Sequence, residues 1–406
     1  VVAASFIINI GILIGFKYFD FLLDNVNAAL GVFGIQAVEK PFDVILPVGI
    51  SFYTFQALSY TVDVYRGDVQ AERNVFNYAL FVSFFPQLVA GPIERSGNLL
   101  KQLNTVPQTV KLDYRRITNG LTIMLWGFFL KMVIADRLAV MVDRIFGEYY
   151  LYQSTALVAA AVGFAFQIYC DFASYSTIAI GAAQVMGFTL MENFNTPYFA
   201  VSIKDFWRRW HISLTRWFTD YVYIPLGGNR KGMKRTLWNL FCVFLLTGVW
   251  HGASWNYILW GVINGICVLA ERCAREKSFY QKIPDIVKWA ATMAIVFFSW
   301  QVFYFSDFNR LGVFMKRLIG ISAANAAGTV EYTYRHYLTA KLIGLSAIAV
   351  LGATTFCMPW AEKVKNYFDR TKTGLFIKET GLILLMILSV IFLINSSYSP
   401  FLYFQY

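Results

Sequence analysis

Residues 236–269 read TLWNLFCVFLLTGVWHGASWNYILWGVINGICVL. A helix crosses a bilayer in about 20 residues, so this apolar stretch is too long for one span and too short for two full ones. It predicts a broken helix or a tight hairpin of helices within the membrane. Small residues at G-x-x-x-G spacing, Gly248 with Gly252 and Gly261 with Gly265, would let helices approach closely or give a substrate access to His251.

Other apolar runs repeat this signal along the chain. Of the 406 residues, 57% are hydrophobic and 15% are charged, against about 25% charged in a typical soluble domain. The composition predicts an all-α polytopic membrane protein, and so many runs disfavour the alternative of a soluble protein with buried helices. We expect the remaining spans at 1–23, 44–62, 74–92, 117–142, 155–170, 176–190, 286–305, 338–358 and 380–395.

The chain contains no extended polar linker, so we expect a single membrane domain over residues 1–406. It begins inside an apolar run without a methionine, and we expect its natural N-terminus to lie upstream. The five cysteines form no C-x-x-C pair, which predicts buried thiols rather than a disulfide or zinc framework.

The net charge is +11, with 35 basic and 24 acidic residues. Such a charge can indicate nucleic-acid binding in a soluble protein, but here the positive-inside rule explains it and we expect no nucleic-acid partner. Segment 201–236 alone carries eight basic and two acidic residues, a net charge of +6. We therefore expect 201–236 to be an interfacial segment on the cytoplasmic face.

Within that segment, residues 205–218 read DFWRRWHISLTRWF. At about 100° per residue, the aromatic side chains fall on one arc, the arginines fall on the other side, and His211 lies at the border. This pattern predicts one helix lying in the membrane interface, with tryptophans at headgroup depth and arginines toward water.

The chain has three histidines, His211, His251 and His336. His336 lies in a polar stretch and is expected in a loop. His251 lies at membrane depth, where an ionisable residue usually faces a polar cavity or a partner. It could instead be structural and donate to a carbonyl on a neighbouring helix.

An imidazole could serve several chemistries at this position. His211 and His251 are 40 positions apart and lack an H-x-x-x-H or carboxylate cluster, so we expect no metal site. There is no G-x-S-x-G elbow that would indicate a nucleophilic serine. A neutral histidine could also act as a general base that takes a proton from a hydroxyl group attacking an acyl thioester.

Several long motifs resemble the membrane-bound O-acyltransferase superfamily, and more narrowly its alginate O-acetylase branch. The resemblance runs from about Phe42 to the C-terminus and rests on 47–67, 81–95, 167–181, 193–232, 245–261 and 399–406. It implies a multi-helix fold with re-entrant or broken helices, in which a cytoplasmic funnel meets an extracellular tunnel. Members transfer an acyl group from a cytoplasmic thioester to an acceptor hydroxyl.

The resemblance assigns roles by position. His251 matches the catalytic histidine of the superfamily, and His211 matches its second characteristic position. Many relatives have a further histidine at Asn264, so that histidine is either dispensable or this branch handles its substrate differently. We expect substrate or donor contacts from Arg208, Arg209, Trp210, Asp171, Tyr175, Asn195 and Asn256. The alternative is that the arginines only follow the positive-inside rule and that the polar residues make structural hydrogen bonds.

The expected function is O-acetylation of an alginate-like extracellular or cell-envelope polysaccharide. Acetyl-CoA or a phosphopantetheine thioester would enter from the cytoplasm as substrate, with no bound cofactor, and His251 would act as general base. An extracytoplasmic esterase-like partner would complete transfer to the polysaccharide, and the protein would lie, multi-pass among lipids, in the bacterial inner membrane. The alternatives are peptidoglycan O-acetylation, D-alanyl transfer to teichoic acid from a carrier protein, and a transporter without chemistry.

Overall fold

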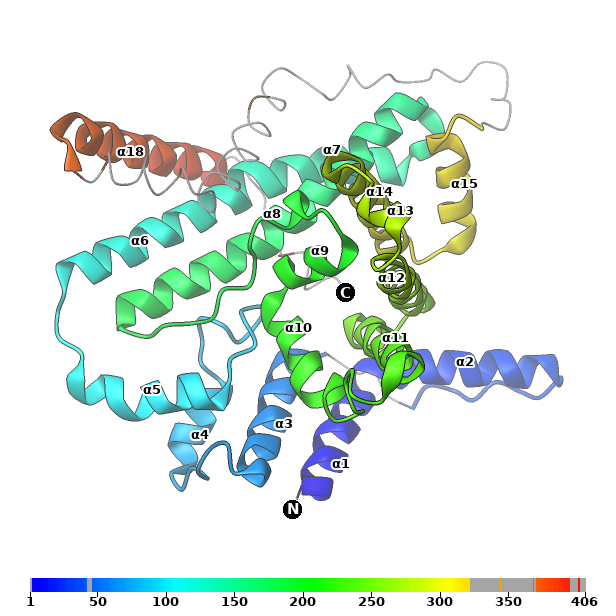
Figure 1. Cartoon of the computed structure of the whole chain (residues 1–406), viewed down its shortest axis with the longest axis horizontal. Coiled ribbons are helices and arrows are strands. Elements are labelled where there is room, and N and C mark those ends of the chain that lie inside the picture. The colour runs from blue at the N-terminus through cyan, green and yellow to red at the C-terminus, as the bar shows by residue number, and fades with distance from the viewer. Residues whose placement is uncertain are drawn as a thin grey trace.

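The computed structural model describes residues 2–41, 46–321, 344, 368, 370–394 and 401. Over these residues the chain is helical and contains no β-strand, which confirms the all-α prediction (Figure 1). The helices are α1 Val2–Leu13, α2 Phe19–Val32, α3 Ile50–Arg66, α4 Val75–Val82, α5 Ser96–Thr109, α6 Tyr114–Phe129, α7 Asp136–Gly147, α8 Ser154–Met186, α9 Ile203–Arg209, α10 Ile212–Phe218, α11 Gly232–His251, α12 Trp255–Ala274, α13 Ser278–Gln281, α14 Asp285–Tyr304, α15 Phe308–Leu318 and α18 Lys372–Ile394.

Five helical segments in the described part are long and apolar enough to cross a membrane. They are Val2–Val32, Ser154–Met186, Trp255–Ala274, Asp285–Tyr304 and Lys372–Ile394. The runs expected at 1–23, 286–305 and 380–395 overlap these segments, and 44–62 overlaps α3, which is not among the five. The expected span 338–358 lies outside the described residues apart from 344, as does His336.

Two expected spans, 155–170 and 176–190, are a single helix, α8. The residues between these two expected spans include Asp171, which is buried inside the protein. Its carboxylate pairs with the ammonium group of Lys131 at 2.6 Å, and Lys131 also pairs with Asp136 at 2.9 Å. A charge that is paired in this way can be buried without interrupting the helix.

The expected span 74–92 is also different in the structure. Only Val75–Val82 is helical, and the chain then continues irregularly to α5. Pro86 and Pro92 fall in this irregular stretch, and neither has a backbone N–H to donate to a helix. The expected span 117–142, by contrast, lies within a continuous helical segment made of α6, a π-helical turn at Leu130–Ala135, and α7.

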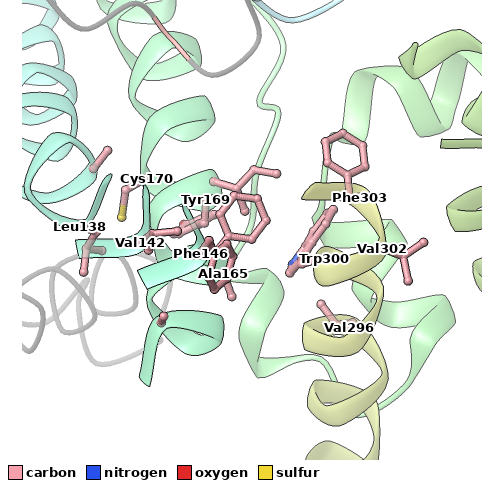
Figure 2. Packing of buried hydrophobic residues seen from close by; sticks show 14 of the residues in the cluster. Leu138, Val142, Phe146, Ala165, Tyr169, Cys170, Val296, Trp300, Val302 and Phe303 are labelled. Atoms are coloured by element: carbon pink, nitrogen blue, oxygen red, sulfur yellow. The ribbon is translucent and has the colours of Figure 1, made fainter. Parts of the chain in front are cut away.

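Helices α6 and α8 run side by side (Figure 1). They approach closely because glycines face each other: a Cβ atom on Gly120 would lie 2.7 Å from the carbonyl oxygen of Gly181. The main core is aromatic, and Figure 2 shows Tyr169 of α8 on one side with Trp300 and Phe303 of α14 on the other. This core surrounds α9, which lies near the middle of the molecule (Figure 1).

The stretch 205–218 is divided between two short helices, α9 and α10, so the expectation of a single helix is wrong. They meet at His211, whose φ of 45° is left-handed and ends the first helix. The tryptophans do not face outward either, since Trp207, Trp210 and Trp217 are at most 9% exposed and pack in the core. An aromatic arc packs equally well against protein, and the surrounding aromatic core supplies that contact.

Candidate active site

Helices α11 and α12 form a hairpin, one of the two arrangements expected for 236–269, although each helix has 20 residues and the pair extends beyond the apolar stretch at both ends. Helix α11 ends at His251 because Gly252 is extended, with φ −171° and ψ 162°, and α12 begins at Trp255. The two helices touch along their glycines, since a Cβ atom on Gly248 would lie 3.1 Å from the Cα atom of Gly261. The glycine spacing therefore serves close helix packing, and the turn of the hairpin places a histidine at its tip.

A cavity of about 460 Å³ extends to this tip. One wall is a single face of α11, formed by Thr236, Leu240, Val243, Phe244, Thr247 and His251. These residues cover about 22 Å of helix at 1.5 Å per residue. The opposite wall includes His211, Trp207 and Trp210, so the two histidines that the sequence selected line the same cavity.

His211 is held at the cavity by Asn193. Its Nδ1 atom lies 3.1 Å from the Oδ1 atom of Asn193, which also accepts a hydrogen bond from the hydroxyl group of Ser213 at 2.9 Å. An amide oxygen only accepts, so Nδ1 carries the proton and Nε2 carries the lone pair. Nε2 is buried and has no hydrogen-bond partner among the described residues, which leaves an acceptor at the cavity wall.

His211 is 2% exposed and lies outside the five candidate spans. Burial, and to a smaller extent the nearby His251, lowers the pKa of His211 well below its ordinary value of 6.5. Phe172 packs edge-on against the imidazole, with ring centroids 4.7 Å apart. His211 is therefore neutral at physiological pH.

His251 lies among aromatic rings at the other side of the same cavity. Its ring centroid is 5.1 Å from that of Trp250, 5.0 Å from that of Trp260 and 5.3 Å from that of Phe303. Trp250 also lies 6.1 Å from His211, so one indole borders both imidazoles. This enclosure restricts water and suits an imidazole that acts in a dry site.

The mouth of the cavity is charged. Lys204 and Arg208 of α9 and Arg272 and Arg275 of α12 line it, together with Glu271. The carboxylate of Glu271 accepts hydrogen bonds from the backbone N–H groups of Ile203 at 2.6 Å and Lys204 at 3.2 Å, so it caps α9 and fixes it against α12. The sequence analysis did not select Arg272 and Arg275. The predicted hairpin could have pointed to them, because it brings the end of its second helix close to the start of its first.

Arg209 and Asn195 lie apart from this cavity. They line a neighbouring polar pocket of about 450 Å³, which Arg208 also borders. Arg209 is held by Asp205 at 2.8 Å and donates to the hydroxyl group of Thr196 at 3.2 Å. Of the arginines and aromatic residues selected from the sequence, Arg208 and Trp210 therefore line the histidine cavity, whereas Arg209 does not.

The other selected residues make structural contacts and do not line either pocket. Asp171 pairs with Lys131, and the hydroxyl group of Tyr175 accepts from the backbone N–H of Val89 at 3.3 Å. Asn256 donates to the carbonyl of Phe303 at 2.8 Å, which ties the start of α12 to α14. At the position where relatives carry a further histidine, buried Asn264 donates to the carbonyl of Trp260 at 2.9 Å.

A second group of contacts that the sequence analysis missed lies behind His251. Lys17 and Tyr18 donate to the last carbonyl groups of α11. A lysine within an apolar run is itself a signal of a buried role, and FKYF at 16–19 carries that signal.

Within the described residues, no three His, Cys, Asp or Glu side chains are grouped to hold a metal ion. The expectation that the cysteines are buried is only partly correct. Cys170 is buried, Cys242 and Cys267 are half-buried, and Cys273 is exposed. Cys357 lies outside the described residues.

The chain matches the membrane-bound O-acyltransferase family over residues 72–315, a region that contains both histidines and the whole cavity. The chain belongs to the membrane-bound O-acyltransferase family. It is therefore a membrane acyltransferase, as its motifs indicated, and a transporter without chemistry is not supported.

Curated members of the membrane-bound O-acyltransferase family match most of the chain. A probable alginate O-acetylase of Pseudomonas putida is 38% identical over 98% of this chain and 83% of its own length. A peptidoglycan O-acetyltransferase of Helicobacter pylori is 32% identical over 98% of this chain and 81% of its own length. A teichoic acid D-alanyltransferase of Bacillus subtilis is 28% identical over 64% of this chain and 68% of its own length.

Proposed function

We propose that the protein is an O-acetyltransferase of the bacterial inner membrane that moves acetyl groups from a cytoplasmic thioester toward a cell-envelope polysaccharide. The observation that carries this proposal is one cavity with a basic mouth and two histidines at its inner end. The relatives named for alginate and peptidoglycan O-acetylation support an acetyl group and a glycan acceptor.

The cavity suits a donor with a phosphate-bearing head and a long, narrow arm. The head group of acetyl-CoA, or the phosphate of a phosphopantetheine carrier, would bind Lys204, Arg208, Arg272 or Arg275 at the mouth, because guanidinium groups bind phosphate well. The arm would extend along the apolar face of α11 for about 22 Å. The thioester carbon would then lie near His251.

His251 is the proposed general base. The imidazole takes the proton of the acceptor hydroxyl as its oxygen attacks the thioester carbon. The carbon–sulfur bond then breaks, and the imidazolium returns the proton to the leaving thiolate, so the atoms and charges balance without a bound cofactor. Such a base typically contributes about 10²–10⁴-fold to the rate.

His211 has a supporting role in this scheme. Its Nε2 atom presents a lone pair at the cavity wall, because Asn193 holds the proton on Nδ1. It would accept a hydrogen bond from a second hydroxyl group of the acceptor, one that does not react, and so orient the acceptor while the reacting hydroxyl donates its proton to His251. The acceptor would arrive from the outer side, where an extracytoplasmic esterase-like partner completes the transfer to the polymer.

Donor choice is the test of this function. Purified protein in nanodiscs is given acetyl-CoA and a soluble oligosaccharide acceptor, and release of free thiol is measured. We expect acetyl-CoA consumption and no reaction with a D-alanyl carrier protein. Consumption of the D-alanyl carrier alone would instead assign the function of the teichoic acid relative.

A further inference from the structure

Lys17 is a charged residue in the first apolar segment of the chain, at the π-helical turn Ile14–Tyr18. Its ammonium group donates to the hydroxyl group of Ser51 at 3.1 Å and to the carbonyl oxygens of Trp250 at 2.8 Å and His251 at 3.0 Å. An ammonium group has three protons to donate, and these three acceptors match them. The contact joins residue 17 directly to the residue proposed as the base.

The end of α11 needs such a partner. The last four carbonyl groups of an α-helix have no N–H partner within the helix, and Gly252 is extended, so the helix does not continue. Lys17 binds two of these carbonyl groups, and the hydroxyl group of Tyr18 donates to a third, that of Val249, at 2.6 Å. A positive charge at a helix C-terminus is also favoured by the helix dipole.

The same segment contacts the residue that follows the break. Phe21 of α2 packs edge-on against Trp255, with ring centroids 5.6 Å apart, and the indole N–H of Trp255 donates to Asn25 at 3.0 Å. The N-terminal segment therefore binds α11 before the hairpin tip and α12 after it. A π-helical turn often marks a functional position, and here it presents both Lys17 and Tyr18 to α11.

We propose that Lys17 is a positioning residue for acyl transfer, whose ammonium group fixes the backbone of His251 and so sets the direction of its imidazole into the cavity. Tyr18 assists by holding Val249. The inference rests on the proposed role of His251 as general base. Lys17 binds the terminal carbonyl groups of α11 and does not line the cavity. It would therefore affect the reaction through His251 and not through contact with the donor.

The test compares Lys17→Met with Lys17→Arg in nanodiscs by steady-state acetyl-CoA turnover. We expect Lys17→Met to lower kcat by about 10²-fold, the loss that a small misplacement of a catalytic group can cause, with KM for the donor unchanged. Lys17→Arg keeps the charge and should recover part of kcat. Lys40→Met is the matched control, because Lys40 pairs with Asp20 at a partly exposed site, and it should behave as wild type.

A second readout needs no donor. The chain has three histidines, so ¹³C-labelled histidine gives a simple NMR spectrum in which His251→Gln identifies the signal of residue 251. Lys17→Met should shift the His251 signal and leave that of His211 in place. Should Lys17→Met fail to fold, Tyr18→Phe removes one hydroxyl group and is judged by the same two readouts, with a smaller expected effect.

The outcomes separate this inference from the function on which it rests. Wild-type kcat in folded Lys17→Met, or a loss of kcat accompanied by an equal change in KM and a shifted His211 signal, would overturn the positioning role. Wild-type kcat in His251→Ala would instead overturn the proposed base. An inactive His251→Ala beside a fully active Lys17→Met would leave the function intact and refute only the role of Lys17.

Discussion

The Nδ1 atom of His211 lies 3.1 Å from the Oδ1 atom of Asn193, two residues that the chain places 18 positions apart. This contact decides which nitrogen of His211 carries the proton, and it leaves Nε2 as an acceptor in the cavity that His251 also lines. The arrangement therefore provides two imidazole groups with different surroundings in one enclosed space.

Asn193→Leu tests this contact. Leucine has a similar size but cannot accept a hydrogen bond, so the proton of His211 loses its fixed position and the hydroxyl group of Ser213 loses its acceptor. We expect kcat to fall about tenfold, the rate cost of about 1.4 kcal/mol. Asn309→Leu, at an exposed position on α15, is the control. A ¹⁵N-histidine spectrum with the Nδ1-protonated pattern of His211 unchanged in Asn193→Leu would contradict the assignment.

The buried His211 predicts a loss of stability in acid. Its pKa is lowered in the folded protein, so below about pH 6.5 the unfolded chain binds a proton that the folded protein does not. The stabilisation is present above that pH and decreases as the pH falls. We expect the melting temperature in nanodiscs to fall between about pH 7 and pH 5, and to fall less in His211→Gln. Equal acid dependence in both proteins would show that folded His211 accepts the proton.

The basic mouth predicts an effect on donor affinity. Arg208→Glu and Arg272→Glu each remove a cation from the cavity entrance, and we expect KM for acetyl-CoA to rise about tenfold or more with kcat nearly unchanged. Arg115→Glu changes the net charge equally at an exposed position of α6 and serves as the control. An equal rise in KM for all three variants would indicate general electrostatic attraction rather than a donor site.

The packing of the hairpin predicts that alanine substitution lowers stability more at Gly248 than at Gly265. A Cβ atom on Gly248 would collide with the carbonyl oxygen of Tyr257 and lie 3.1 Å from the Cα atom of Gly261, so backbone must move. On Gly265 the nearest atoms are side-chain atoms of Phe241 and Phe244 at 3.3 Å, which can adjust. We expect Gly248→Ala to destabilise the protein by about 1–3 kcal/mol and Gly265→Ala by less. Thermal unfolding measures both, and the reverse order would contradict the close packing at Gly248.

The sequence predicted the helical class, the hairpin and the two cavity histidines, because length, apolar content and the family motifs are local properties. It failed where distant residues decide the outcome. The sequence analysis divided residues 155–190 into two spans on either side of Asp171, whereas Lys131, in the π-helical turn Leu130–Ala135, pairs with Asp171 within one long helix. No pattern near Asp171 contains that information.

The prediction for residues 205–218 failed for a related reason. The aromatic side chains do form an apolar surface, as predicted. A periodic pattern does not say, however, whether lipid or protein covers that surface. The left-handed backbone at His211, which divides the stretch into α9 and α10, has only a weak signal in the residue type, because histidine adopts this conformation more often than most residues but still rarely. Arg272 could have been predicted. In a hairpin of α11 and α12, the end of α12 returns to the start of α11, which follows the basic segment 201–236.

The most direct test of the central claim is the kcat of His251→Ala in nanodiscs with acetyl-CoA and an oligosaccharide acceptor. If the imidazole at the hairpin tip removes the acceptor proton, kcat should fall by about 10²–10⁴-fold while donor affinity and melting temperature remain close to those of the wild type. A folded His251→Ala variant that transfers acetyl groups at the wild-type rate would contradict the account.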